Sequence, residues 1–394
     1  MDNLRIVIVG AGMGGLTTAI AMKKAGYEVE LYDRVRELRP AGAGISLWSN
    51  GVKILNQLGL GQEISAIGGS MKRMAYHTQT GATLTDFSLD ALVNQVGQCP
   101  YPVSRTDLQS MLLKAFGADR VTLNAKCIAV EQTSDSATAI FDNGHRATGD
   151  VVVGADGTHS IIREALLGHP TNRRYAGYVN WNGLVEADET LAPRTSWVIY
   201  VGNGQRASLM PVGGDPLQGG KAERFYFFFD VPLPKDAEPW DNIRDELLHH
   251  FAGWAEPVQR LIQRLDPAKT NRVPIHDIEP ISALVKGRIA LLGDAGHSTT
   301  PDLGQGGCQA MEDAWVLAST LLTTNISVAD ALHRYERARR DRTAEIVLKA
   351  RKRANMMHGY EPERTERWYQ ELAQEDGSKI MEAIASIILK GPLH

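Results

Sequence analysis

The apolar positions of this chain form continuous runs near the N-terminus and alternating runs in the middle. Ile6–Val9 is an uninterrupted β-branched run, which is typical of a strand buried on both faces of a parallel sheet. Periodic apolar positions over Leu16–Ala25 predict an amphipathic helix, and Val29–Tyr32 predicts a second strand. The order strand, helix, strand opens a doubly wound α/β sheet. Val151–Val153 and Arg288–Leu292 predict further buried strands.

Between residues 175 and 230 the pattern changes to short alternating or aromatic-rich runs separated by turn residues. Such runs predict antiparallel strands, which we place over Val179–Val185, Ser196–Val201, Ser208–Pro211 and Phe225–Phe229. They indicate a second domain laid over the first. A charged helical segment follows over 242–265, and the chain is mostly helical from about residue 328. We interpret the basic stretch 335–353 as a solvated helix face, with a phosphate-binding arm as the alternative.

Composition and charge exclude several classes of function. The formal net charge of −4 leaves no electrostatic footprint for nucleic acid. No apolar run approaches the roughly 20 residues that span a bilayer, and we find no signal peptide before the first strand, so a soluble cytoplasmic protein is expected. The three cysteines are far apart and the histidines are scattered, so we expect neither a disulfide framework nor a metal site. The sequence indicates no oligomeric state.

The first motif with chemical meaning is a glycine-rich turn, Gly10-Ala11-Gly12-Met13-Gly14-Gly15. It follows a predicted strand and precedes a predicted helix, as GxGxxG does in dinucleotide-binding folds. Gly10 allows the tight turn, Gly12 lets the backbone approach a pyrophosphate, and Gly15 permits close packing of helix and strand. Asp33 ends the second strand, where a carboxylate can bind ribose hydroxyls. These features together predict a dinucleotide site.

Three later segments favour FAD over NAD as the dinucleotide. Asp156 lies in Gly154-Ala155-Asp156-Gly157 after a predicted strand, and Asp294 lies in Gly293-Asp294-Ala295-Gly296-His297 after another. A carboxylate at the end of a parallel strand can accept from polyol hydroxyls, which the ribityl chain of FAD has and NAD lacks. The loop 304–307 leads into a helical run, and a helix N-terminus aimed at a reduced flavin would stabilise its negative charge by about 1 kcal/mol.

These motifs, together with Arg105 in Ser104-Arg105-Thr106-Asp107-Leu108 and the run 293–307, resemble those of the class A flavoprotein aromatic hydroxylases. That family shares the fold of para-hydroxybenzoate hydroxylase, and the similarity covers essentially the whole chain. The fold class expected is therefore α/β: a Rossmann-type FAD-binding domain, a second and mainly antiparallel β-sheet substrate domain, and C-terminal helices. We expect a discontinuous FAD-binding domain over 1–70, 100–168 and 270–325, a substrate domain over 71–99 and 169–269, and a helical region over 326–394.

The resemblance implies a role for each matching residue. Gly10, Gly12, Gly15 and Asp33, with Met13 in the same turn, would hold the ADP half of FAD. Arg105 would contact the FAD backbone, Asp156 would serve FAD and NAD(P)H, and Asp294 would bind the ribityl chain and pyrophosphate. Pro301, Gly304, Gly306 and Gly307 would lie beside the isoalloxazine ring. Many members carry asparagine where this chain has Cys308, which we interpret as a small packed residue, with a reactive thiol as the alternative. His297 is expected to be a structural hydrogen-bonding residue.

Residues in the middle of the chain indicate which substrate is expected. The runs 173–183, 206–211 and 224–230, and Pro301-Asp302, are similar to the FAD-dependent urate hydroxylases of bacterial purine catabolism. Arg206 offers a planar fork of donors that suits the edge of the flat urate anion, and the Tyr226 phenol can donate or accept beside it. Asp302 is a candidate for moving a proton or orienting the substrate. The alternative for Arg206 is a surface arginine. For Tyr226 it is a core aromatic residue, and for Asp302 it is a turn residue.

The resulting hypothesis is an FAD-dependent monooxygenase that uses NAD(P)H, with NADH favoured by the resemblance, and O₂. The hydride would reduce the flavin, O₂ would give a C4a-hydroperoxyflavin, and C5 of urate would take the distal oxygen to give 5-hydroxyisourate. Two alternatives stay open. One is a hydroxylase of another nitrogen heterocycle or a phenol, of the hydroxynicotinate or salicylate type. The other is a non-catalytic carrier of flavin or lipid.

Overall fold

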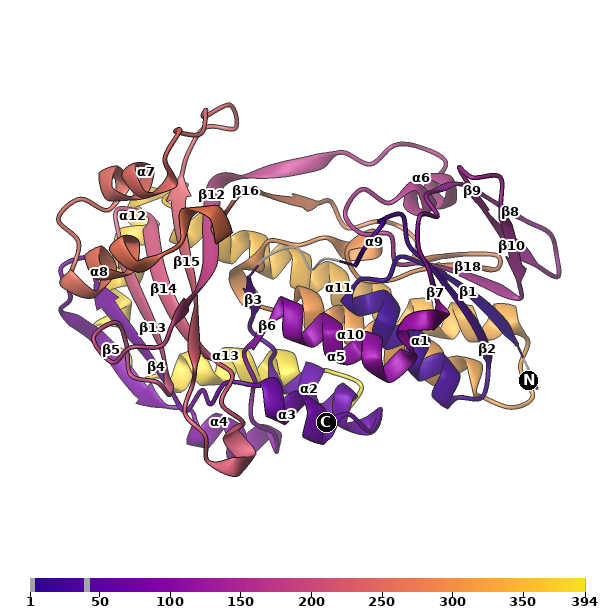
Figure 1. Ribbon diagram of the computed structural model, residues 1–394, viewed down its shortest axis with the longest axis horizontal. Helices are drawn as coiled ribbons and strands as arrows, with labels where there is room; N and C mark the ends of the chain where they lie inside the picture. The colour runs from indigo at the N-terminus through magenta and orange to yellow at the C-terminus, as the bar shows by residue number, and fades with distance from the viewer. Residues whose placement is uncertain (1–3, 39–42, 394) are drawn as a thin grey trace.

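Residues 4–38 and 43–393 of the computed structural model fold around two large sheets that face a shared central region (Figure 1). The first sheet is six-stranded, and all its pairings are parallel except that of β17 with β18. Its strands, in spatial order, are β17 (Val285–Lys286), β18 (Ile289–Leu291), β11 (Val151–Gly154), β1 (Arg5–Val9), β2 (Glu28–Tyr32) and β7 (Val121–Thr122). Ile6, Val7 and Ile8 are completely buried, which confirms the prediction that this run is a strand buried on both faces of the sheet.

Helices cover this sheet, and the glycine-rich turn connects β1 to the first of them. The predicted helix after β1 is α1 (Met13–Lys24), which packs against α5 (Arg105–Phe116) and α10 (Gly306–Leu321). A three-stranded sheet of β8 (Cys127–Gln132), β9 (Ala137–Phe141) and β10 (Arg146–Gly149), and a small pair of β3 (Gly44–Ile45) with β6 (Val103–Ser104), were not predicted. Further helices are α2 (Ser49–Gln57), α3 (Gly61–Ile67), α4 (Asp90–Val96), α6 (Ile161–Leu167) and α9 (Asp294–His297).

The second sheet contains the four strands predicted in the middle of the chain. In spatial order it runs β16 (Asn271–Ile278), β12 (Arg173–Glu186), β15 (Arg224–Pro232), β14 (Gln205–Val212), β13 (Ser196–Gly202), β4 (Arg73–Thr78) and β5 (Thr83–Ser88). Its pairings are antiparallel except β4 with β13. β16 comes from the range that we assigned to the FAD-binding domain. It joins this sheet instead because it pairs with β12 over most of its length.

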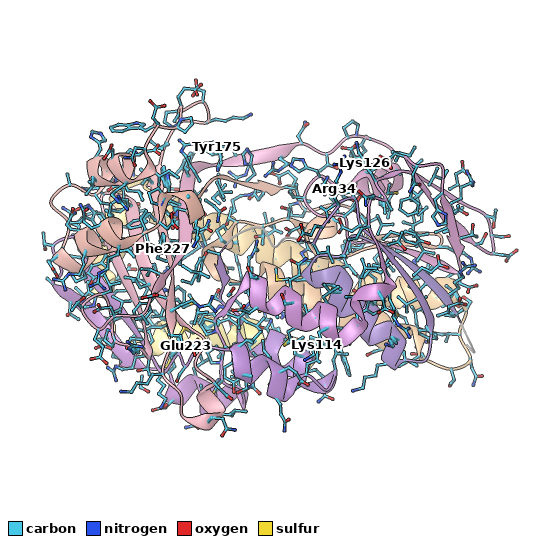
Figure 2. The ribbon with its side chains drawn as sticks, in the orientation of Figure 1. Arg34, Lys114, Lys126, Tyr175, Glu223 and Phe227 are labelled. Carbon is cyan, nitrogen blue, oxygen red and sulfur yellow. The ribbon has the colours of Figure 1, made fainter. Side chains whose placement is uncertain are left out.

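The alternation of side chains gives the second sheet two different faces. Phe225, Phe227 and Phe229 are completely buried against α7 (Ile243–His250) and α8 (Glu256–Arg264); Phe227 is labelled in Figure 2. The predicted single helix over 242–265 is thus two helices, because Gly253 adopts a positive φ of 75° in the turn between them. The other face, which carries Tyr226 and Phe228, looks toward the flavin-motif loops.

Three helices end the chain: α11 (Val328–Met357), α12 (Pro362–Leu372) and α13 (Ser378–Leu389). The interpretation of 335–353 as a solvated face was wrong for several of its arginines. Arg339 has only 1% of its side chain exposed and pairs with Glu312 and Asp313. α11 packs along α10, so its cations neutralise carboxylates that α10 buries. Within the described ranges, none of the helices combines the length and apolar character that a bilayer crossing requires.

Candidate active site

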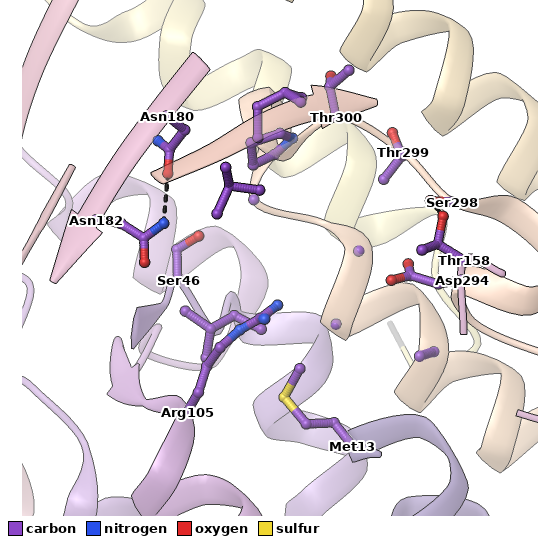
Figure 3. Close-up of a pocket in the computed structure, with 18 of the residues that line it drawn as sticks. Met13, Ser46, Arg105, Thr158, Asn180, Asn182, Asp294, Ser298, Thr299 and Thr300 are labelled. Carbon is purple, nitrogen blue, oxygen red and sulfur yellow. Dashed lines mark hydrogen bonds between the residues drawn. The ribbon is translucent and has the colours of Figure 1, made fainter. Parts of the chain in front are cut away.

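A cavity of about 550 Å³ opens where the carboxyl ends of β1, β11 and β18 meet the inner face of the second sheet (Figure 3). Open α/β sheets bind ligands at such strand ends. The cavity takes lining residues from both sheets and from the loops between them. The predicted site residues among them are Gly12, Met13, Arg105, Asp294, Pro301, Asp302, Gly304, Gly306, Gly307, Arg206 and Tyr226.

The glycine-rich turn has the geometry expected of a phosphate-facing loop. Gly10 has a φ of 108°, and a Cβ there would lie 2.2 Å from the Ala155 carbonyl oxygen. A Cβ on Gly15 would lie 1.8 Å from the carbonyl oxygen of Gly10, so both glycines are required by packing. A Cβ on Gly12 would meet nothing within 4 Å. The turn is therefore closed on its protein side and open at Gly12.

Two of the predicted acidic residues lie outside the cavity lining. The carboxylate of Asp33 accepts from the backbone N–H groups of Ala11, at 2.6 Å, and Val35, at 3.0 Å, so it fastens the glycine turn to the end of β2. Asp156 caps α6, where it accepts from the Ser160 hydroxyl and from the Ile161 N–H at 2.9 Å. Burial raises the pKa of Asp156 above its ordinary value. The backbone around Asp156, rather than its carboxylate, faces the cavity.

The loop 293–307 contributes most of one cavity wall. Asp294 begins α9 and is exposed, and Figure 3 shows it near Ser298 and Thr158, away from Arg105. Gly304 has a φ of 61°, and a Cβ there would lie 2.3 Å from the Ser46 hydroxyl oxygen. Gly306 starts α10, whose unpaired N–H groups are directed toward the cavity end of the helix. The hydroxyl oxygens of Thr299 and Thr300 are buried without a hydrogen-bond partner in this wall.

Behind that wall lie the two residues expected to be structural. His297 Nε2 lies 2.6 Å from Asp313 Oδ2, and the same oxygen accepts from the Gly293 N–H at 2.9 Å. Cys308 is completely buried at the start of α10. Burial raises the pKa of the Cys308 thiol to about 12. The structural expectation for His297 and the packed-residue interpretation of Cys308 are both confirmed, and the reactive thiol is excluded.

On the opposite wall, Arg206 is a buried cation in β14, so the alternative of a surface arginine is excluded. Its side chain is 9% exposed, Nε donates to Asp230 Oδ2 at 2.6 Å, and the guanidinium lies 4.8 Å from the centre of the Phe228 ring. Burial would lower the pKa of Arg206, but the carboxylates of Asp230 and Asp302 raise it above its usual value. Arg206 pairs with Asp230 and Ser208 with Phe228, so these four positions share one face of the sheet.

Tyr226 lies two residues before Phe228 and lines the same wall. Its ring packs so closely on the backbone of β3 that a Cβ on Gly44 would lie 2.3 Å from the ring. Burial raises the pKa of Tyr226 to about 12, so the phenol keeps its proton at neutral pH. It can therefore donate a hydrogen bond into the cavity.

Asp302 lies in the short 3₁₀ turn Pro301–Leu303, and its carboxylate turns away from open space. That side chain has no exposed surface: Oδ2 accepts from the Tyr178 hydroxyl at 2.8 Å, and Oδ1 lies 3.3 Å from His358 Nε2 and 3.5 Å from Arg206 Nη2. Burial alone would raise the pKa of Asp302, but these partners hold it at about 2. The carboxylate of Asp302 is thus ionised and fully buried, although the residue belongs to the cavity lining.

Several lining residues were not singled out from the sequence. Asn180 and Asn182 lie on the inner face of β12, and Figure 3 shows the hydrogen bond between them, from Asn182 Nδ2 to Asn180 Oδ1 at 2.7 Å. Asn180 in turn donates to Asp230 at 2.7 Å. Their spacing of two within a predicted strand was the available signal, because it places both on one face. Trp197 and Ser46 gave no such signal.

The fold and the cavity define a flavin-binding protein of the hydroxylase type, and comparison with known proteins gives the same class. A family model described as "FAD binding domain" matches residues 3–350, and the chain belongs to this FAD-binding family. FAD-dependent urate hydroxylases are similar over the full length. That of Klebsiella pneumoniae subsp. pneumoniae is 50% identical over 392 residues, which are 99% of this chain and 100% of that protein. That of Mycolicibacterium vanbaalenii is 49% identical over 99% of this chain and 98% of that protein.

Solved structures agree with this assignment. The crystal structure of Klebsiella pneumoniae HpxO complexed with FAD and uric acid matches with a TM-score of 0.94 and 49% identity, over 99% of this chain and 98% of that one. A salicylate hydroxylase substrate complex matches with a TM-score of 0.76 at 24% identity, which shows the shared fold alone. The resemblance to the class A flavoprotein hydroxylases and the expected α/β fold are confirmed.

Proposed function

We propose that this protein is an FAD-dependent urate hydroxylase, which converts urate to 5-hydroxyisourate with NADH and O₂. The observation that carries the proposal is the placement of Arg206. This buried cation lies on the cavity wall that faces the flavin-motif loops, between the Phe228 ring and two buried carboxylates. The full-length similarity to proteins named FAD-dependent urate hydroxylases supports the same substrate.

The residues present fit FAD. The backbone at Gly12 has open space, which a pyrophosphate requires for close approach. The buried hydroxyls of Thr299 and Thr300 lack partners within the described residues and line the wall, so polar flavin atoms would satisfy them. A cavity of about 550 Å³ is within the usual range for cofactor sites.

We assign the FAD contacts as follows. The turn from Gly10 to Gly15 and the N-terminus of α1 would hold the pyrophosphate, Asp33 would lie near the adenosine ribose, and Arg105 and Asp294 would bind from opposite walls. Pro301 and the N-terminus of α10, with Gly304, Gly306 and Gly307, would lie beside the flavin ring. Asp156 would act by fixing the loop beside the cofactor. When bound, FAD supplies the redox chemistry: it accepts a hydride and transfers an oxygen atom derived from O₂.

Arg206 recognises the substrate anion. Its Nη1 meets only the thioether of Met357 among the described residues, at 3.7 Å, and a thioether is a weak acceptor. That nitrogen therefore has donor capacity for a urate oxygen, and a charge-assisted hydrogen bond of this kind is among the strong ones. The amides of Asn180 and Asn182, with the protonated phenol of Tyr226, line the same wall and provide further polar partners for the N–H and C=O edge.

Hydroxylation of urate does not require a strong general base in the cavity wall that carries Arg206. Urate is already an anion near neutral pH, so the protein's tasks are to position its ring, to exclude water and to stabilise charge. Asp302, whose carboxylate is enclosed, acts through Arg206 rather than on the substrate. A phenol substrate would require a base at the cavity surface.

Substrate choice tests the proposal. With purified, FAD-loaded protein, kcat/KM for hydroxylation should be highest for urate when compared with hydroxynicotinate and salicylate under the same conditions. NADH should serve better than NADPH. A higher kcat/KM for salicylate or hydroxynicotinate would contradict the urate assignment and leave the monooxygenase class intact. Colourless protein that retains no flavin would favour the non-catalytic carrier instead.

A further inference from the structure

His358 lies at the end of α11, and its ring bridges two segments that are far apart in the sequence. Nε2 lies 3.3 Å from Asp302 Oδ1, in the turn that carries the flavin motif. Nδ1 lies 3.1 Å from the carbonyl oxygen of Gly204, in the turn between β13 and β14. Arg206 lies two residues after Gly204, in β14. His358 therefore ties the loop of Asp302 to the hairpin that presents Arg206.

Both atoms that the ring faces are acceptors only. A carbonyl oxygen and an ionised carboxylate cannot donate, and a neutral imidazole has one N–H, so it can satisfy one of the two contacts. Only the imidazolium donates from both nitrogens. The ring also stacks on Tyr178 with 3.9 Å between centroids and an interplanar angle of 27°, an arrangement in which an aromatic face favours a cation.

The charges of this buried cluster then balance. Arg206 and the His358 imidazolium supply two positive charges, and Asp230 and Asp302 supply two negative charges; all four side chains are at least nine-tenths buried. Without the second cation, an anionic substrate would approach a cluster with a net negative charge. Like charges in a buried site repel strongly, so the imidazolium favours the binding of an anion.

We infer that His358 is a positioning residue of the substrate site. As a doubly donating imidazolium it fixes Asp302 against Arg206 and compensates the charge of that carboxylate. Tyr178, which donates to the other oxygen of Asp302 and stacks on His358, is the second member of this support. The inference rests on the proposed function, because it assigns the cluster to the binding of an anionic ring.

Paired variants test the inference. His358→Gln keeps an N–H donor near Asp302 without the charge, and His358→Leu removes both. We expect KM for urate to rise by roughly tenfold in the leucine variant, as for the loss of a hydrogen bond to a charged group, and by less in the glutamine variant. The exposed His333 on the same helix, changed to Gln and to Leu, is the matched control and should leave KM unchanged. If His358 had a merely structural role, its variants would lower thermal stability and FAD content, but KM for urate would not rise more in the leucine variant than in the glutamine variant.

The outcomes also distinguish this inference from the proposed function. Wild-type protein that fails to hydroxylate urate contradicts the function, whatever the variants do. Crystal structures of the His358 variants then still decide the placement: Asp302 should leave Arg206 in His358→Leu and stay in His358→Gln. An unmoved Asp302 in the leucine variant would contradict the positioning role. If the leucine variant does not fold, Tyr178→Phe provides the test, because it removes only the hydroxyl that donates to Asp302. This variant should also raise KM for urate. An unchanged KM would contradict the positioning of Asp302 by His358 and Tyr178.

Discussion

At the scale of single residues, the proposed substrate site depends on Arg206, a buried cation whose side chain is held by several contacts. Arg206 has carboxylates on two sides, an aromatic ring beneath it and a thioether at Nη1. The sequence was sufficient to select this arginine, because its run matched a known group of hydroxylases. It was insufficient to find Asp230, Tyr178 and His358, because their positions depend on strand pairing and on the return of α11 to the cavity.

Replacing Arg206 by lysine should separate charge from shape. Lysine keeps the positive charge but loses the planar fork and the fit over Phe228. We expect KM for urate to rise by about tenfold to hundredfold, with more of the consumed NADH appearing as peroxide. Steady-state kinetics with a peroxide assay measures both. Arg337→Lys, at an exposed position of α11, is the control. Wild-type kinetics in Arg206→Lys would refute the recognition role.

Asp302 makes a pH-dependent contribution to stability. Its pKa is about 2 in the folded protein and near 3.8 without the fold, so the ionised form is favoured by folding. The contribution, about 2 kcal/mol, is fully present above roughly pH 5 and is lost as the pH falls from about 4 to 2. Urea unfolding of the wild type and Asp302→Asn should show a difference in unfolding free energy that shrinks over that window. A difference independent of pH would contradict this assignment.

At the scale of elements, the strands were predicted better than the helices that return to the core. Continuous apolar runs located β1, β2, β11 and β18, and alternation located β12 to β15. The error on α11 has a simple cause. A basic stretch looks solvated in the sequence, but Arg339, Arg342 and Arg351 meet carboxylates that other elements bury. Periodicity cannot identify such partners in advance.

The buried ion cluster between α10 and α11 gives a stability prediction. Arg339→Met would leave Asp313 without its arginine and Glu312 with Arg342 alone. We expect the free energy of unfolding to fall by about 3–5 kcal/mol, because removing one partner leaves a buried charge uncompensated. Chemical denaturation measures the change, and Arg337→Met on the exposed side of the same helix is the control. A loss no larger than that of the control would mean that the cluster contributes little.

Because Asp313 also holds Gly293 and His297, the same variant should weaken FAD retention. Arg339 of α11 therefore supports the loop 293–307 through Asp313. This connection was absent from the sequence-based account, which treated 326–394 as a separate helical region.

At the scale of the whole molecule, the cavity exists only where the two sheets meet. The flavin motifs occupy one wall and the polar face of the second sheet occupies the other, as Figure 3 shows for Asp294 and Asn180. Motifs in the sequence predicted both walls separately. They could not predict how the walls face each other, because that depends on tertiary packing between segments more than a hundred residues apart.

The most direct test of the central claim is oxidation of NADH by purified, FAD-loaded protein with and without urate, while urate absorbance and peroxide are followed. We predict that urate accelerates NADH oxidation and disappears in step with it, with little peroxide. If urate leaves the rate unchanged, or accelerates it while only peroxide accumulates, urate is not the substrate.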